Sequence, residues 1–226
     1  MVEQKKILIV TGGSLCPDFA ADYMKRHTFH EVIAADAGLD HCKRLGITPT
    51  VILGDFDSLK EKELLDGYRK KGVRIECFPT RKDYTDTHLA MELSIKMRPS
   101  QVHVLGATGT RIDHTLANIG LLTRMADEGI ECLILDDHNV IQMLKGPDEK
   151  IFQRTKQKSY VSLLACSKEV KGITLTGFSY PLHDAVMHAF DSLGISNEIA
   201  EDKACLKIDS GYLLVIRSTD DHWRLT

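Results

Sequence analysis

The sequence lacks any apolar run that approaches the roughly 20 residues needed to span a bilayer. Its first residues pass from charge straight into a strand-like run, with no apolar signal stretch or cleavage site. The six cysteines are scattered without CxxC spacing, so we expect reduced thiols that are mostly buried as small hydrophobic groups. These absences lead us to expect a cytoplasmic protein with no membrane partner.

An excess of charge of one sign is also missing. The chain has 29 Lys and Arg against 32 Asp and Glu, a formal net charge of -3. Such a chain has no general attraction for nucleic acid or for anionic lipid, so we expect no nucleic-acid partner. Any binding of phosphate must come from local groups. A length of 226 residues allows one large domain or two small ones, each with a proper core.

The first 137 residues alternate short apolar runs with helical patterns. This alternation predicts a mostly parallel sheet with helices packed on its faces. Glu76 and Cys77 weaken the fourth run, which favours an edge position for that strand. The predicted strands are residues 7–10, 31–35, 50–53, 74–78, 101–105 and 131–135, and the helical patterns include 59–71, 87–97 and 113–128.

The pattern changes near residue 138. Short segments there alternate apolar and polar residues and are separated by glycines, which predicts antiparallel strands. The fold class is therefore α/β followed by β: an N-terminal α/β domain over residues 1–137 and a small antiparallel β-sandwich over 138–226. The predicted strands of this half are residues 140–145, 160–165, 173–175, 204–208 and 212–216.

Polar residues and glycines follow five consecutive strands of the predicted parallel sheet. Ligands of open α/β sheets bind beyond the carboxyl ends of the strands, and five such segments together are strong support for a site. The segments are residues 11–14, 36–38, 54–58, 82–86 and 106–114.

Two carboxylates, Asp55 and Asp57, lie two residues apart, so an extended segment projects both to the same side. Asp83 and Asp86 arrive from the next strand end. Hard oxygen ligands of this kind suit Mg²⁺, which favours one or two carboxylates together with substrate phosphates. Four crowded carboxylates would repel one another without a cation. The alternative is that Asp57 or Ser58 only caps the following helix.

The glycines suggest close approach of the backbone to phosphate. Gly12, Gly13, Gly106 and Gly109 could let N–H groups reach phosphate oxygens, or could simply form turns. Their spacing is neither GxGxxG nor the P-loop pattern. Arg111 offers a planar fork matched to phosphate, or a surface partner for Asp113.

Two other basic residues are less clear. Lys82, beside Asp83, could contact the nucleotide or stay on the surface, and the sequence leaves open whether His114 does more than support its loop.

These segments, in this order, resemble the bacterial type of thiamine pyrophosphokinase. The matching stretches are ADAGLDHCKRLGITPTVILGDFDS, KDYTD and GATGTRIDHTLANI, with weaker matches in TGFSYPL and GISNE. The resemblance implies an ATP-binding α/β domain, a β-sandwich that contributes to the thiamine site, and a homodimer with active sites shared between subunits.

Roles follow from the resemblance position by position. Asp55, Asp57 and Asp86 look like the magnesium and catalytic carboxylates, and Asp55 and Asp86 also like substrate contacts. Thr85, Arg111 and Asp113 look like phosphate-binding and hydroxyl-positioning groups. The nucleotide pocket would also include Asp36 and Gly38, and thiamine would meet Tyr180, where some relatives carry Trp. The remaining expected positions are Gly12, Gly13, Lys82, Thr108 and Gly109 for the nucleotide, and Ser196 and Asn197 for thiamine.

The expected reaction is attack of the thiamine hydroxyl on the β-phosphorus of ATP, which gives thiamine diphosphate and AMP. Asp86 or Asp113 could accept the hydroxyl proton. Three alternatives remain at this point: a diphosphokinase for another alcohol such as a hydroxymethylpterin, a metal-dependent phosphohydrolase, and a nucleotide-sensing module without catalysis.

Overall fold

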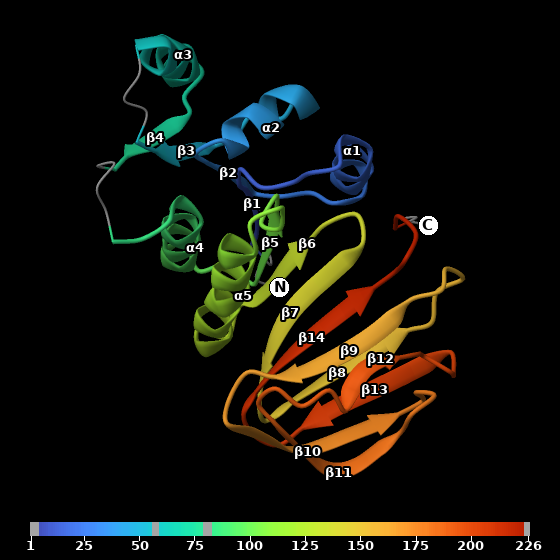
Figure 1. Ribbon diagram of the computed structural model, residues 1–226. Helices are drawn as coiled ribbons and strands as arrows, with labels where there is room; N and C mark the ends of the chain where they lie inside the picture. Colours follow the sequence, from blue (N-terminus) through green and yellow to red (C-terminus); the bar gives the residue numbers. More distant parts are fainter. Residues whose placement is uncertain (1–4, 56–58, 79–82, 224–226) are drawn as a thin grey trace. The chain divides into compact units, whose positions relative to one another are not determined.

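A computed structural model describes residues 5–55, 59–78 and 83–223 of the chain (Figure 1). Contacts divide the chain into two units, one of Met1–Leu121 with Glu128–Asp137 and one of Leu122–Asp127 with His138–Thr226. Asp57 and Lys82, both expected at the site, lie outside the described residues.

The first unit is built on six parallel strands. Their order is β6-β5-β1-β2-β3-β4, and each neighbouring pair is parallel. The apolar runs form these strands because both faces are covered, and all four residues of β3 are buried. The strands are β1 (Lys6–Val10), β2 (Glu31–Ala35), β3 (Val51–Gly54), β4 (Arg74–Cys77), β5 (Gln101–Leu105) and β6 (Glu131–Leu135).

Five helices connect these strands. In Figure 1 the first three lie on one face of the sheet, and the last two lie on the other. This is the arrangement that right-handed crossovers produce when the chain moves outward from β1 to β4 and then returns to β5. The helices are α1 (Pro17–Arg26), α2 (Gly38–Leu45), α3 (Leu59–Lys70), α4 (Asp86–Lys96) and α5 (Ile112–Asp127).

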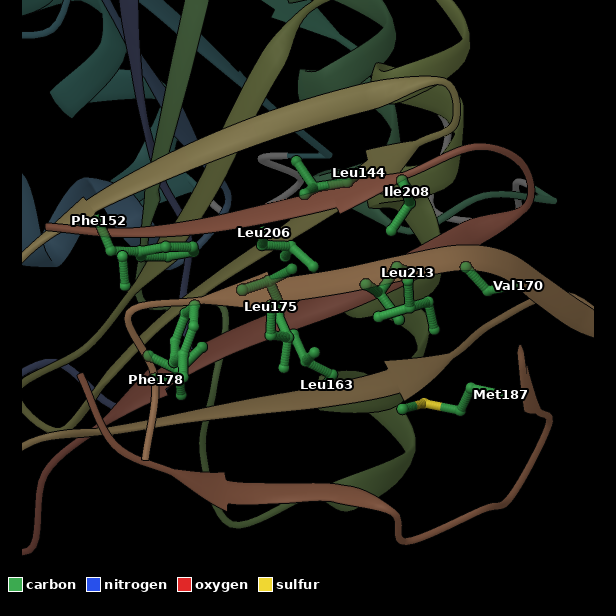
Figure 2. Close-up of a cluster of buried hydrophobic side chains, with 14 of the residues drawn as sticks. Leu144, Phe152, Leu163, Val170, Leu175, Phe178, Met187, Leu206, Ile208 and Leu213 are labelled. Carbon is green, nitrogen blue, oxygen red and sulfur yellow. The ribbon is translucent and has the colours of Figure 1, made fainter. Parts of the chain in front are cut away.

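The second unit contains two antiparallel sheets, ordered β12-β9-β14-β7 and β11-β10-β13-β8. Both sheets supply side chains to one buried core, which includes Leu163, Leu175 and Leu213 (Figure 2). A β-sandwich is the result. Its strands are β7 (Asn139–Lys145), β8 (Asp148–Gln153), β9 (Tyr160–Ala165), β10 (Glu169–Thr176), β11 (Leu182–His188), β12 (Gly194–Asn197), β13 (Lys203–Ile208) and β14 (Tyr212–Ser218).

The predicted fold class is confirmed, and β4 occupies the predicted edge of its sheet. Three strands of the sandwich, β8, β11 and β12, escaped prediction. In β8 only Phe152 is fully buried, and the run begins with the charged residues Asp148, Glu149 and Lys150. A strand with this many charged residues lacks the alternation of apolar and polar residues by which strands are predicted.

Candidate functional site

The site of the first unit lies where the direction of the chain through the sheet reverses. Strand β1 has β2 on one side and β5 on the other, so the connections that follow β1 and β5 diverge and leave a crevice. A pocket of about 610 Å³ lies there. It is lined by residues that follow β1, β2 and β5 and by the start of α4, four of the five predicted segments.

The glycine segment after β1 is hydrogen-bonded to the segment after β5. Gly13 N–H donates to Gly106 O at 2.7 Å, and Ser14 N–H donates to Thr108 O at 2.7 Å. A Cβ at Gly13 would lie 2.3 Å from Gly106 O, so only glycine allows this approach. Gly12, Gly13 and Gly109, the glycines expected to contact the nucleotide, all line the pocket. The Gly13 amide is already used, however, and Gly13 brings two loops together instead of offering a free donor.

The segment after β2 forms a tight turn into α2. Asp36 has a φ of 49°, a left-handed conformation that Asp tolerates better than most residues, and it lines the pocket. Gly38 is buried and does not line the pocket. A Cβ at Gly38 would lie only 2.0 Å from Val10 O, so this glycine is required by packing between α2 and β1.

The start of α4 forms another wall. Thr85 is the N-cap, and its hydroxyl accepts a hydrogen bond from His88 N–H at 3.2 Å. Asp86, the first residue of the helix, is half-buried and lines the pocket with Thr85. Thr87 turns inward, where its hydroxyl lies 3.0 Å from that of Thr11. This buried pair links α4 to the end of β1.

The loop after β5 is anchored from two sides. The Thr108 hydroxyl donates to Asp136 Oδ2 at 2.8 Å, so this predicted nucleotide contact has its proton already engaged. Asn118, on α5, donates from Nδ2 to Ala107 O at 2.7 Å and is only 6% exposed. Sequence reasoning missed Asn118. The signal available was its spacing, one helical turn after His114, which lines the same pocket.

Arg111 also lines the pocket, while Asp113 is its partner. Arg111 Nε and Nη2 donate to Asp113 Oδ1 and Oδ2 at 3.2 and 2.6 Å. These hydrogen bonds hold the pKa of the Asp113 carboxyl below its usual value. Both side chains are well exposed. The predicted phosphate-binding arginine and the predicted hydroxyl-positioning carboxylate thus face each other.

The other predicted carboxylates are less closely grouped than expected. Asp55 is half-buried directly after β3 and does not line the pocket. Within the described part of the chain, Asp55, Asp83 and Asp86 do not form a group whose oxygens all lie within 4.8 Å. The expected crowding of four carboxylates is therefore not observed for these three. Mutual repulsion between carboxylates favours such separation.

In the second unit, Asn197 holds the segment that carries Tyr180. Asn197 Oδ1 accepts from Tyr180 N–H at 3.0 Å, and Asn197 Nδ2 donates to Tyr180 O at 2.8 Å. Asn197 is 6% exposed, whereas the Tyr180 side chain is 71% exposed. Ser196 has a φ of 58° and donates its N–H to Ser162 Oγ at 3.0 Å. The three predicted thiamine contacts thus form one local structure.

Comparison with known proteins matches both units. Residues 21–134 match the family model described as "Thiamin pyrophosphokinase, catalytic domain", and residues 148–213 match "Thiamin pyrophosphokinase, vitamin B1 binding domain". The thiamine pyrophosphokinase of Bacillus subtilis is 35% identical over 218 residues, which cover 96% of this chain and 100% of the relative. The chain belongs to the thiamine pyrophosphokinase family.

Solved structures of the thiamine pyrophosphokinase family agree with this assignment. The Bacillus subtilis structure has a TM-score of 0.84 at 34% identity, covering 96% of this chain and 100% of that one. The Geobacillus thermodenitrificans structure has a TM-score of 0.78 at 30% identity, covering 95% and 98%. The match to a vitamin B1 binding domain favours thiamine over a pterin as acceptor. None of the described helices is long and apolar enough to cross a membrane.

Proposed function

We propose that the pocket of the first unit binds ATP and that the chain transfers its pyrophosphoryl group to the hydroxyl of thiamine, giving thiamine diphosphate and AMP. The activity is that of the thiamine pyrophosphokinase family, to which both matched regions belong. The observation that carries the location is the pocket of about 610 Å³ at the switch point between β1 and β5. Its walls combine glycines, hydroxyls and Arg111.

Arg111 is the proposed anchor of the transferred group. Its side chain is 69% exposed at the pocket, and the guanidinium presents a planar fork that matches two phosphate oxygens. Attack at the β-phosphorus requires the β- and γ-phosphates to be held as one unit. Catalysis of this kind depends on positioning and on charge stabilisation, and fixed donors at the phosphates supply both.

Carboxylate oxygens are the preferred protein ligands of Mg²⁺, and binding of the ion would have to draw together carboxylates that are not grouped within 4.8 Å among the described residues. Asp55, Asp57 and Asp86 would hold it. Asp86 lines the pocket at the first turn of α4, and Asp55 directly follows β3, whereas Asp57 lies outside the described residues. When bound, the ion would neutralise charge on the phosphates.

The hydroxyl proton of thiamine needs an acceptor. Asp113 becomes available as a base when Arg111 turns to the phosphates, because the two hydrogen bonds that lower the Asp113 pKa are then released. Asp86, which lines the same pocket, is the other candidate. Either carboxylate would orient the hydroxyl and accept its proton as the new P–O bond forms.

We propose that thiamine is recognised by the second unit. The exposed ring of Tyr180 offers a face on which a cationic thiazolium can stack, with Ser196 beside it and Asn197 holding the segment. Two acidic residues of the same unit, Asp184 and Glu198, are candidates for attracting a positive ligand, and Glu198 forms an ion pair with Lys158 at 3.8 Å.

A homodimer with shared active sites is proposed as the working form. Its support is a set of exposed apolar side chains on the second unit, which are otherwise unfavourable in water. These are Val186, Phe190, Leu193 and Ile195, with Phe190 fully exposed. The proposed compartment is the cytoplasm, in keeping with six free cysteines. Size-exclusion chromatography with light scattering, on the chain and on its Phe190→Asp variant, tests the dimer.

The deciding experiment combines the purified chain with ATP, Mg²⁺ and thiamine and follows AMP and thiamine diphosphate together. Equal amounts of both products, abolished by EDTA and restored by Mg²⁺, would support the reaction and the metal. AMP without thiamine diphosphate would leave the ATP site standing and remove thiamine as the acceptor. A parallel reaction with a hydroxymethylpterin in place of thiamine tests the alternative acceptor.

A further inference from the structure

His41 is a buried histidine beside the glycine segment of the pocket. It lies in α2, is 9% exposed, and places Nε2 2.8 Å from the carbonyl oxygen of Gly13. The His41 side chain does not line the pocket, but Gly13 does. A histidine on the buried face of a helix would ordinarily be a packing residue. The contact with a pocket backbone group gives this one a second role.

The position of the ring proton follows from the neighbour of His41. Arg44 Nη2 contacts His41 Nδ1. An arginine has only donors, so Nδ1 must accept this hydrogen bond and carries no proton. A neutral imidazole then bears its proton on Nε2. His41 therefore donates from Nε2 to Gly13 O.

This hydrogen bond is the restraint on the carbonyl side of a peptide group whose N–H side is also held. The peptide between Gly13 and Ser14 is held at its carbonyl by His41 and at its N–H by Thr108 O, 2.7 Å away. Glycine has wide conformational freedom, so without His41 only the hydrogen bonds on the N–H side would oppose rotation of this peptide. Rotation would move a carbonyl dipole at the wall of the pocket, where phosphate charge must be accommodated.

We propose that His41 is a positioning residue for ATP: its Nε2–H group holds the Gly13 carbonyl so that the Gly12–Ser14 segment keeps the shape that receives the phosphates, and Arg44 keeps the ring in the required tautomer. The inference rests on the proposed binding of ATP in this pocket. His41 touches no reacting atom in this arrangement and acts only through Gly13.

The test compares two amides at one position. In His41→Gln the side-chain amide reaches about as far as Nε2 and can still donate to Gly13 O, whereas in His41→Asn it reaches only about as far as Nδ1. ATP affinity is measured by calorimetry on the purified full chain without thiamine. We expect the Kd for ATP to rise about tenfold in His41→Asn and to stay within about twofold of wild type in His41→Gln. A role in packing alone would lower the melting temperature of both variants and leave their Kd values alike.

Arg44→Met adds a variant on the exposed side of α2, where folding is not at risk. We expect the Kd for ATP to rise about threefold, because the ring loses the partner that selects its tautomer. Lys43→Met, on the adjacent residue, is the matched control and should leave the Kd unchanged. Equal Kd values in Arg44→Met and Lys43→Met, or in His41→Gln and His41→Asn, would overturn the inference. A wild-type chain that does not bind ATP would overturn the proposed ATP site itself.

Discussion

Arg111 and Asp113 face each other through two parallel hydrogen bonds, from Nε to Oδ1 at 3.2 Å and from Nη2 to Oδ2 at 2.6 Å. The same guanidinium lines the proposed ATP pocket. Phosphate oxygens would compete with the carboxylate for the same fork, since each group presents two oxygens that can accept the two parallel hydrogen bonds. Binding of ATP and release of Asp113 are therefore coupled in the proposed mechanism.

Arg111→Lys tests the fork directly. We expect kcat to fall about 100-fold, because an ammonium cannot replace two fixed donors at the phosphates. The melting temperature should not change, since both members of the pair are exposed and surface ion pairs add little stability. Arg69→Lys is the matched control, an exposed arginine paired with Asp66 at 2.7 Å in α3. Wild-type kcat in Arg111→Lys would contradict the assignment.

Gly38→Ala tests the close packing of α2 against the end of β1, next to the pocket. The new Cβ would lie 2.0 Å from Val10 O and 2.9 Å from Thr11 Cα, both backbone atoms that cannot move independently. We expect the free energy of unfolding to fall by about 3 kcal/mol, measured by urea denaturation. Gly67→Ala, in α3 with open space around it, should instead add about 1 kcal/mol. A stable Gly38→Ala protein would show that α2 can shift away from β1.

The strands of the parallel sheet could be predicted because burial on both faces leaves a continuous apolar run, as in Ile7, Leu8 and Ile9. The pocket could be located because the carboxyl ends of parallel strands must meet at one edge. β11 could not be predicted, since in this strand Met187 is the one fully buried residue. The sequence of a strand with so few buried residues resembles that of a loop.

The hydrogen bonds and packing contacts that hold the site together could not be predicted from the sequence. Thr11 and Thr87 are 76 residues apart, and nothing local to either one indicates that their hydroxyls lie 3.0 Å apart. His41 likewise lies 28 residues from Gly13, and no local pattern indicates their hydrogen bond. Gly13 was predicted at the pocket for its freedom to approach phosphate, whereas its packing against Gly106 is a long-range property. Local pattern identifies which segments converge, but the pairing of individual polar atoms depends on the complete fold.

His103 should make stability depend on pH. It lies in β5, is 4% exposed, and its Nδ1 is 2.7 Å from the Tyr23 hydroxyl. Burial first, then the nearby His27 and Lys6 charges, lower its pKa to about 4. The unfolded chain takes up this proton near pH 6.5, so the stabilisation is complete above pH 6.5 and is lost as pH falls toward 4. The expected loss is about 3 kcal/mol.

Comparison with a His103 variant separates the contribution of His103 to the pH dependence of stability from that of the carboxylates. Urea unfolding at pH values from 7 to 4 should show a shallower decline in His103→Leu than in wild type. His183→Leu, at an exposed histidine of β11, should follow the wild-type curve. Parallel curves for His103→Leu and wild type would mean that His103 is protonated in the folded state and has another partner.

Variants of Asn197 and Tyr180 distinguish a residue that supports the proposed thiamine site from one that contacts thiamine. Asn197→Leu removes three hydrogen bonds, two with Tyr180 and one from Glu198 N–H at 2.9 Å. We expect it to lower the free energy of unfolding by about 3 kcal/mol and to raise the KM for thiamine about tenfold. Tyr180→Ala should raise the same KM without loss of stability, because the ring is 71% exposed. The KM for ATP should hold in both variants, since ATP is assigned to the first unit. An unchanged thiamine KM in Tyr180→Ala would remove the ring from the site and leave Asn197 a purely structural residue.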